Sequence, residues 1–181
     1  MSSSPTTMRA LQYLTFGQWP EVVEVERPRA GPGQVLLRMT AAGVCHSDIG
    51  LLTRPQAEYP YGALPQTLGH EGAGVVAEIG AGAAGVRLGD DVLVYGPRGC
   101  GHCRSCVAGA ENLCAAAPRL GLRSPGLGAP GTMAEYLLVE DPRHLVPLHG
   151  LDPVQHVSLS DAGLTRITHC GGRGSTWLLE T

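Results

Sequence analysis

Short runs of β-forming residues recur along this chain and are separated by turn residues. In the run at 34–39, Val35, Leu37 and Met39 recur at every second position, which places them on one face of a strand. Similar runs occupy residues 9–14, 21–26, 72–80, 91–96 and 133–140. The pattern predicts a mainly β fold, a barrel or a sandwich, with short strands and many turns.

Glycine and proline mark the connections between these runs, as at 31–33 and 129–131. With 26 glycines and only 4% aromatic residues, the chain must build its core from Val, Leu, Ala and Ile. The segment that follows Cys45, HSDIGLL, predicts a short helix. Residues 1–7 are polar and precede the first patterned run, so we expect a disordered N-terminal extension there.

The glycines at 80–85, GAGAAG, match the G-x-G-x-x-G spacing of dinucleotide-binding loops. That motif requires a helix to follow, because the helix N-terminus binds the phosphates. Here the chain continues as VRLGDDVLVYGP, which has two aspartates and another strand-like run. The sequence therefore predicts a plain loop at 80–85.

Charge and hydropathy exclude two classes of partner. The basic residues are 13 arginines against 16 acidic residues, so the formal net charge is −3 and no basic face for nucleic acid is expected. No apolar run approaches the roughly 18 residues of a membrane span, and the N-terminus lacks the pattern of a signal peptide. We expect a soluble cytoplasmic protein without membrane contact.

Four of the six cysteines lie close together with the spacing C-x2-C-x2-C-x7-C: Cys100, Cys103, Cys106 and Cys114. Four thiolates at this spacing predict a closed tetrahedral Zn²⁺ site with a structural role. Two disulfides are the rival interpretation, but a chain without a signal peptide in a reducing cytosol should keep its thiols. The pattern favours zinc, and His102 within the loop is predicted to be a solvated bystander.

Two further motifs precede this lobe: CHSD at 45–48 and GHEG at 69–72. Together with the four cysteines, in this order and at these separations, they resemble the zinc-dependent medium-chain alcohol dehydrogenases. The stretches GLGAPGTMAEYLLVEDPRHLVPL and LDPVQHVSLSDAGLT bring the resemblance close to bacterial secondary-alcohol dehydrogenases. It implies a GroES-like β-barrel catalytic domain over 8–160, with a structural zinc lobe at about 96–118.

The resemblance implies a second, catalytic zinc held by Cys45, His70 and Asp161. Asp161 stands where the family usually has a second cysteine, and both side chains are anionic. Taken alone, each residue has an ordinary interpretation: a small buried residue, a core histidine and a helix N-cap. Their occurrence together and in order favours the metal site, which leaves one position open for a substrate oxygen.

Four neighbours of these ligands also take roles from the resemblance. Asp48 would accept a hydrogen bond from His70 and fix its tautomer. Ser47 would hydrogen-bond the alcohol oxygen and begin a proton relay, and Glu71 would lie beside the site. His46 would meet the pyrophosphate of the cofactor.

Some positions offer no such assignment. Some relatives continue the proton relay with a histidine where this chain has Gly50, so the exit route for the proton stays open. His144, His149 and His156 show no partner pattern, and we predict them at the surface.

The implied activity is the interconversion of secondary alcohols and ketones, or of alcohols and aldehydes, with NAD(H) and a Lewis-acid zinc. A Rossmann cofactor domain should follow DAGLT, and these 181 residues contain none, so we expect the chain alone to be inactive. The alternative is a non-catalytic zinc-binding remnant or interaction module. A quinone or enoyl reductase is disfavoured because such relatives generally lack this ligand set. Full-length relatives are expected to be homo-oligomers.

The end of the chain departs from this pattern. Residues 161–165 are expected to begin the connection to the cofactor domain. Residues 166–181 have adjacent glycines and no sustained helical period. If the tail is back-translated with GC-rich codons and one cytosine is restored at the codons for Thr165 and Arg166, the reading becomes TPYHALRRARLHLAAGD. Relatives continue DAGLT in a similar way, with a basic, apolar helix. We therefore predict a frameshifted tail, and the alternative is an authentic divergent end.

Overall fold

Strands dominate the part of the chain that this computed structural model describes, residues 5–164. The strands are β1 (Thr7–Tyr13), β2 (Glu21–Glu26), β3 (Val35–Gly43), β4 (Gln66–Thr67), β5 (Glu71–Ile79), β6 (Asp91–Val94), β7 (Ser124–Pro125), β8 (Gly128–Ala129), β9 (Tyr136–Val139) and β10 (Leu145–Pro147). The helices are α1 (His46–Thr53), α2 (Arg104–Val107) and α3 (Pro153–His156), and the single 3-10 turns are η1 (Gln56–Glu58), η2 (Glu111–Leu113), η3 (Pro142–His144) and η4 (Val157–Ser160). The mainly β prediction is confirmed.

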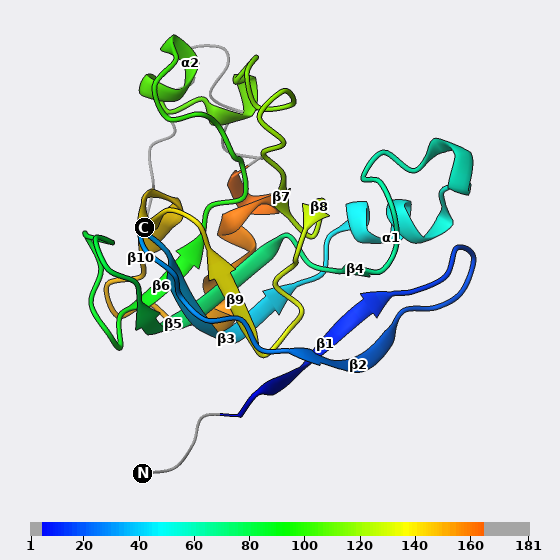
Figure 1. The fold of residues 1–181 in the computed structure, drawn as a ribbon, viewed down its shortest axis with the longest axis horizontal. Coiled ribbons are helices and arrows are strands. Elements are labelled where there is room, and N and C mark those ends of the chain that lie inside the picture. Colours follow the sequence, from blue (N-terminus) through cyan, green and yellow to red (C-terminus); the bar gives the residue numbers. More distant parts are fainter. Residues whose placement is uncertain (1–4, 165–181) are drawn as a thin grey trace, which may run out of the picture.

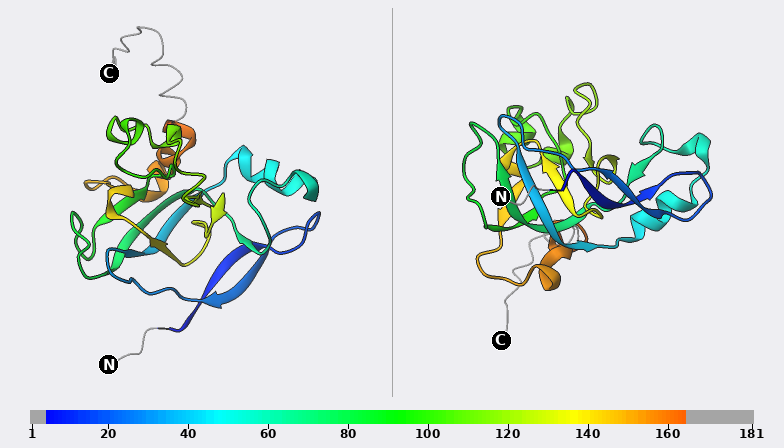
Figure 2. Two further views of the ribbon diagram at one scale, coloured as in Figure 1. Left: turned by 45° about the horizontal axis from the view of Figure 1, so that its top comes forward. Right: turned by 60° about the horizontal axis from the view of Figure 1, so that its bottom comes forward.

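A five-stranded antiparallel sheet in the order β10-β6-β5-β3-β9 forms the body of the fold (Figure 1). Its longest pair, β3 with β5, runs from Val35 opposite Ile79 to Gly43 opposite Glu71. A second sheet has the order β2-β1-β4, and its β1–β2 hairpin extends to one side of the molecule in both views of Figure 2. The loop that carries α2 lies at the top of Figure 1, away from the β1–β2 hairpin, and forms a separate lobe.

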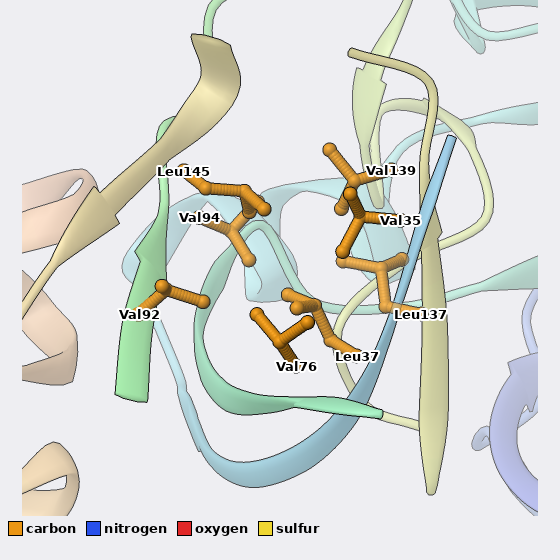
Figure 3. Close-up of a cluster of buried hydrophobic side chains, with 8 residues drawn as sticks. All are labelled: Val35, Leu37, Val76, Val92, Val94, Leu137, Val139 and Leu145. Carbon is orange, nitrogen blue, oxygen red and sulfur yellow. The ribbon is translucent and has the colours of Figure 1, made fainter. Parts of the chain in front are cut away.

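The main core lies on one face of the five-stranded sheet. Figure 3 shows its eight side chains directed toward a shared interior: Val35, Leu37, Val76, Val92, Val94, Leu137, Val139 and Leu145. All are at most 7% exposed, and Met39 packs against them from the end of the predicted alternating run. Branched side chains suit this pleated surface, which explains how a chain with few aromatic residues buries a core.

The glycine-rich segment at 80–85 is a loop between β5 and β6, as predicted. Gly82 and Gly85 adopt positive φ angles of 81° and 86°, which L residues rarely take. Gly80 lies so close to the turn at 31–33 that an added Cβ would be 1.7 Å from the Gly31 carbonyl oxygen. These glycines therefore serve a tight turn and a close backbone approach.

All six predicted runs form strands, and the predicted helix after Cys45 is α1. The sequence does not predict β4, β7, β8 or β10, because two or three residues are too few to show alternation. The C-terminal boundary predicted for the disordered extension, residue 7, is wrong. Thr7 is already in β1, and the Arg27 N–H donates to the Thr6 carbonyl oxygen at 2.9 Å. Residues 1–4 and the predicted frameshifted tail at 166–181 lie outside the described residues.

Among residues 5–164, no helix combines the length and apolar character that a membrane span requires.

Candidate metal centres

The four cysteines of the predicted lobe converge in the loop between β6 and β7. Their sulfur atoms all lie within 4.8 Å of one another, although only Cys106 lies in a helix, α2, and the others lie in the turns before α2 and after η2. The Sγ atoms of Cys103 and Cys106 are 3.4 Å apart, and Cys103 to Cys114 and Cys100 to Cys106 each measure 3.9 Å. These separations are longer than a disulfide bond, so the arrangement of the four sulfurs favours the metal interpretation over two disulfides.

The spacing of these sulfurs fits a tetrahedral zinc. With zinc–sulfur bonds of about 2.3 Å, the edges of a tetrahedron measure about 3.8 Å, close to the observed sulfur separations. Thiolates are also the soft ligands that select this metal. His102 is exposed and turns its Nδ1 toward the Cys100 carbonyl oxygen at 2.7 Å, in agreement with its predicted role as a bystander.

A buried carboxylate links this lobe to η3. Glu111 is only 9% exposed, and its Oε2 accepts the Gly99 N–H at 2.6 Å and lies 3.1 Å from Nε2 of His144. Its Oε1 accepts from Nε of Arg143 at 3.2 Å, while Nη2 of Arg143 donates to the Gly99 carbonyl oxygen at 2.7 Å. Residues from η2, η3 and the start of the lobe are thus joined around one acidic side chain.

The surface prediction for His144 is wrong, because this hydrogen bond holds the ring inside at 3% exposure. Burial lowers the pKa of His144, and the positive charge of Arg98 lowers it further, against the opposing effect of Glu111. The ring is therefore neutral near pH 7 and donates from Nε2. His149 is exposed and His156 is half-buried.

A second cluster joins Cys45, His70 and Asp161, whose ligand atoms also lie within 4.8 Å of one another. Cys45 follows β3 as the N-cap of α1, His70 precedes β5, and Asp161 follows η4. Nε2 of His70 is 3.1 Å from Oδ2 of Asp161. The three residues predicted from the resemblance are therefore brought together from three distant segments.

The donor set of this cluster suits Zn²⁺. Neutral imidazole, one thiolate and one carboxylate supply nitrogen, sulfur and oxygen ligands, and their two negative charges balance the ion. Both ring nitrogens of His70 are buried, and neither makes a hydrogen bond to a residue among 5–164. A metal ligated by Nε2 would satisfy one of these atoms, so the residues fit the ion.

Asp48 links two of these residues. Its Oδ2 accepts the Cys45 N–H at 2.9 Å, and its Oδ1 lies 3.4 Å from Nδ1 of His70, with both side chains buried. The Asp48 carboxylate raises the pKa of His70 to about 9, burial acts in the opposite direction, and Cys45 and Asp161 add to the increase. Asp48 thus faces the ring nitrogen that points away from Asp161, as the orienting role requires.

The start of α1 presents the other predicted side chains. The Ser47 N–H makes the largest contribution to lowering the pKa of Cys45, burial opposes it, and His70 adds to it. The Ser47 hydroxyl is exposed and lies 3.7 Å from Sγ of Cys45. His46, the first residue of α1, is exposed to solvent.

Glu71 lies outside the three-residue cluster although it directly follows His70. Its side chain is buried, and its Oε1 accepts the Ala162 N–H at 2.9 Å. Sequence reasoning missed this partner, and it also missed Glu111 and Arg143. The position of Glu111 between the ligand cysteines Cys106 and Cys114 was the one feature of the sequence that could have indicated its role in the lobe.

The family model described as "Alcohol dehydrogenase GroES-like domain" matches residues 31–150. "Alcohol dehydrogenase 2" of Emericella nidulans is 37% identical over 150 residues, a match that covers 80% of this chain and 39% of that protein. The chain therefore spans well under half the length of this curated relative.

Two solved structures share the fold at higher coverage of this chain. The cobalt and zinc bound thermostable alcohol dehydrogenase from Pyrobaculum aerophilum matches with a TM-score of 0.74 and 35% identity, over 85% of this chain and 45% of that one. Acetophenone reductase from Geotrichum candidum NBRC 4597, in complex with NAD, matches with a TM-score of 0.76 and 32% identity, over 91% of this chain and 47% of that one.

Proposed function

The chain belongs to the alcohol dehydrogenase GroES-like domain family, and from this membership we propose that it forms the zinc-binding catalytic domain of an NAD-dependent dehydrogenase. The reaction converts an alcohol, in particular a secondary alcohol, into the ketone or aldehyde, and the reverse. The observation that carries the proposal is the convergence of Cys45, His70 and Asp161. The zinc bound in one of the two similar structures and the NAD bound in the other support it.

In this proposal Cys45, His70 and Asp161 hold the catalytic zinc and leave one side open to a small substrate. When bound, the zinc supplies Lewis-acid polarisation of the alcohol or carbonyl oxygen. Asp48 holds the His70 ring with Nε2 toward the ion, because its carboxylate faces the opposite nitrogen. The protein's contribution to binding is thus a set of ligands that is oriented before the ion arrives.

The remaining residues act on the substrate and the cofactor. Ser47 would hydrogen-bond the hydroxyl of the alcohol and begin the relay by which its proton leaves, since the Ser47 side chain is exposed beside Cys45. His46 is the first residue of α1 and is exposed, and in this proposal it contacts the pyrophosphate of NAD(H). The four-cysteine site, with all its positions filled by protein, has a structural role.

Metal content tests this assignment directly. Elemental analysis should find two zinc ions per chain. Cys103→Ser should remove one equivalent and destabilise the lobe, whereas Asp161→Ala should weaken only the other site, because the two clusters share no residue. Full retention of both ions by both variants would contradict the ligand sets.

The alternative function is a non-catalytic zinc-binding module. A chimera separates the two functions. Residues 8–164 would replace the matching segment of the Pyrobaculum aerophilum alcohol dehydrogenase, and NADH formation from a secondary alcohol would be followed by absorbance. Turnover that Asp161→Ala abolishes supports the catalytic function, whereas a folded chimera that binds both metals without turnover supports the alternative.

A further inference from the structure

A cavity of about 430 Å³ lies between the β1–β2 hairpin, the paired strands β7 and β8, and the edge strand β9. Its walls are mainly apolar: Met8 and Val25, which face each other across the hairpin, contribute with the buried Pro125 and Leu137. None of the candidate zinc ligands lines it. A cavity of this size, with apolar walls and a few polar groups, is typical of a small-molecule site.

Arg98 brings a positive charge to this cavity. It is half-buried between β6 and the first ligand cysteine, and it lines the cavity wall. Its Nη1 donates to the carbonyl oxygens of the three preceding residues, Tyr95, Gly96 and Pro97. Nε and Nη2 make no hydrogen bond to a residue among 5–164, and neither atom is fully enclosed by protein. One nitrogen thus fixes the guanidinium, and the edge with the other two is left for a ligand.

No carboxylate among residues 5–164 forms an ion pair with Arg98. Glu111 has the strongest attraction for its charge, but that carboxylate is paired with Arg143. Nε and Nη2 lie on one edge of a guanidinium, the arrangement that binds a carboxylate through two hydrogen bonds. Arg9 uses these same two nitrogens to bind Oε1 of Glu135, at 3.0 and 2.8 Å. The open edge of Arg98 therefore has the geometry that a carboxylate requires.

The other charged side chains of the cavity lie at its rim. Glu26, Glu140 and Arg123 are all exposed, so water and salt screen their charges. Of the described residues that line the cavity, Arg98 is the one charged residue that is half-buried. The least screened charge in the cavity is therefore positive.

We propose that this cavity binds a small organic carboxylate with an apolar body, held by Nε and Nη2 of Arg98. The carboxylate accepts from both free donors and neutralises the guanidinium. The apolar body packs against Met8, Val25 and Leu137 and removes their surface from water. The inference does not rest on the proposed function, because no candidate zinc ligand takes part in the site.

Both parts of such a ligand contribute to its affinity. Removing a hydrogen-bonding partner of a charged group weakens binding by about tenfold or more. Each buried methylene group contributes about fourfold in affinity. We therefore use hexanoate as the probe and expect it to bind at least about tenfold more tightly than acetate, which has the charge without the apolar body.

The test is a titration of the zinc-loaded full chain with sodium hexanoate, followed by the NMR shifts of its backbone amides. Arg98→Met keeps an unbranched side chain without the charge and should weaken hexanoate by about tenfold or more. Val25→Trp fills the cavity from β2 without changing Arg98 and should also weaken it. Val22→Trp is the matched control, because Val22 is 67% exposed on the same strand and does not line this cavity. It should bind hexanoate as the wild type does.

Carboxylates also bind zinc, so Asp161→Ala is measured alongside. Hexanoate affinity that is lost in Asp161→Ala but kept in Arg98→Met would place the carboxylate at the metal and overturn the inference. Wild-type affinity in both Arg98→Met and Val25→Trp overturns it, as does a wild type that shows no saturable shift. Equal affinities for acetate and hexanoate also overturn it, because the apolar walls would then contribute nothing. If Arg98→Met loses its far-UV circular dichroism, the comparison of Val25→Trp with Val22→Trp decides the question.

Discussion

Replacing Glu111 with alanine removes the acceptor on which the attachment of the four-cysteine lobe depends. The substitution leaves the Gly99 N–H and Nε2 of His144 without their partner in a site that is 9% exposed. Arg143 also loses a contact, but its side chain is 38% exposed and can turn to water. The variant therefore tests the cost of two buried donors rather than the loss of an ion pair.

The expected magnitude follows from those two donors. Each buried polar group left unsatisfied costs about 1–3 kcal/mol. The contribution of Arg143 is discounted because exposed ion pairs are worth about 0–1 kcal/mol. We expect Glu111→Ala to lower the free energy of unfolding by about 2–6 kcal/mol, from the two donors together.

The measurement is urea denaturation of the zinc-loaded chain at fixed zinc concentration, since bound metal shifts apparent stability. Glu135→Ala is the matched control. Its carboxylate accepts three hydrogen bonds from Arg9, at 2.8, 3.0 and 2.8 Å, but the two side chains are 41% and 71% exposed. Glu111→Ala should lower the midpoint far more than Glu135→Ala does. Equal shifts in the two variants would refute the argument from burial.

Two further predictions concern pH and packing. Burial lowers the pKa of His144 below its usual 6.5, so the folded state favours the neutral ring. The contribution of His144 to stability is therefore complete above pH 6.5 and is lost as the pH falls below that value. Between about pH 7.5 and 5.5 the denaturation midpoint of His144→Gln should fall less than that of the wild type, and a parallel fall would contradict this. Gly80→Ala should destabilise the chain by about 1–3 kcal/mol, because its Cβ meets the Gly31 carbonyl oxygen. Gly50→Ala in α1 should instead raise the melting temperature, because alanine has the higher helix propensity. Equal melting temperatures for Gly80→Ala and Gly50→Ala would contradict the argument that the Cβ at position 80 has no space.

The fold could be predicted as far as local pattern determines it. Val35, Leu37 and Met39 alternate, and the structure directs them toward one core. The strand β10 contains Pro147 and has only three residues, so no period can be read from it. Its existence depends on pairing with β6, which is a tertiary effect that local sequence does not carry.

The candidate sites divide in the same way. Cysteine spacing predicted the lobe because its ligands are close in sequence, and the resemblance supplied the second set. The burial of His144 could not be predicted, because its partner Glu111 lies 33 residues away and a lone histidine has no pattern. The contact of Glu71 with Ala162 spans 91 residues and was equally invisible.

The two clusters also differ in how much chain each must close. The cysteine set lies within residues 100–114, whereas the second set spans residues 45–161. Because the entropic cost of loop closure rises by about 0.6 kcal/mol per doubling of length, the longer span costs about 2 kcal/mol more. During synthesis the lobe can therefore acquire its ion soon after residue 114 leaves the ribosome. The second centre must wait for residue 161, by which time every strand from β1 to β10 has been made.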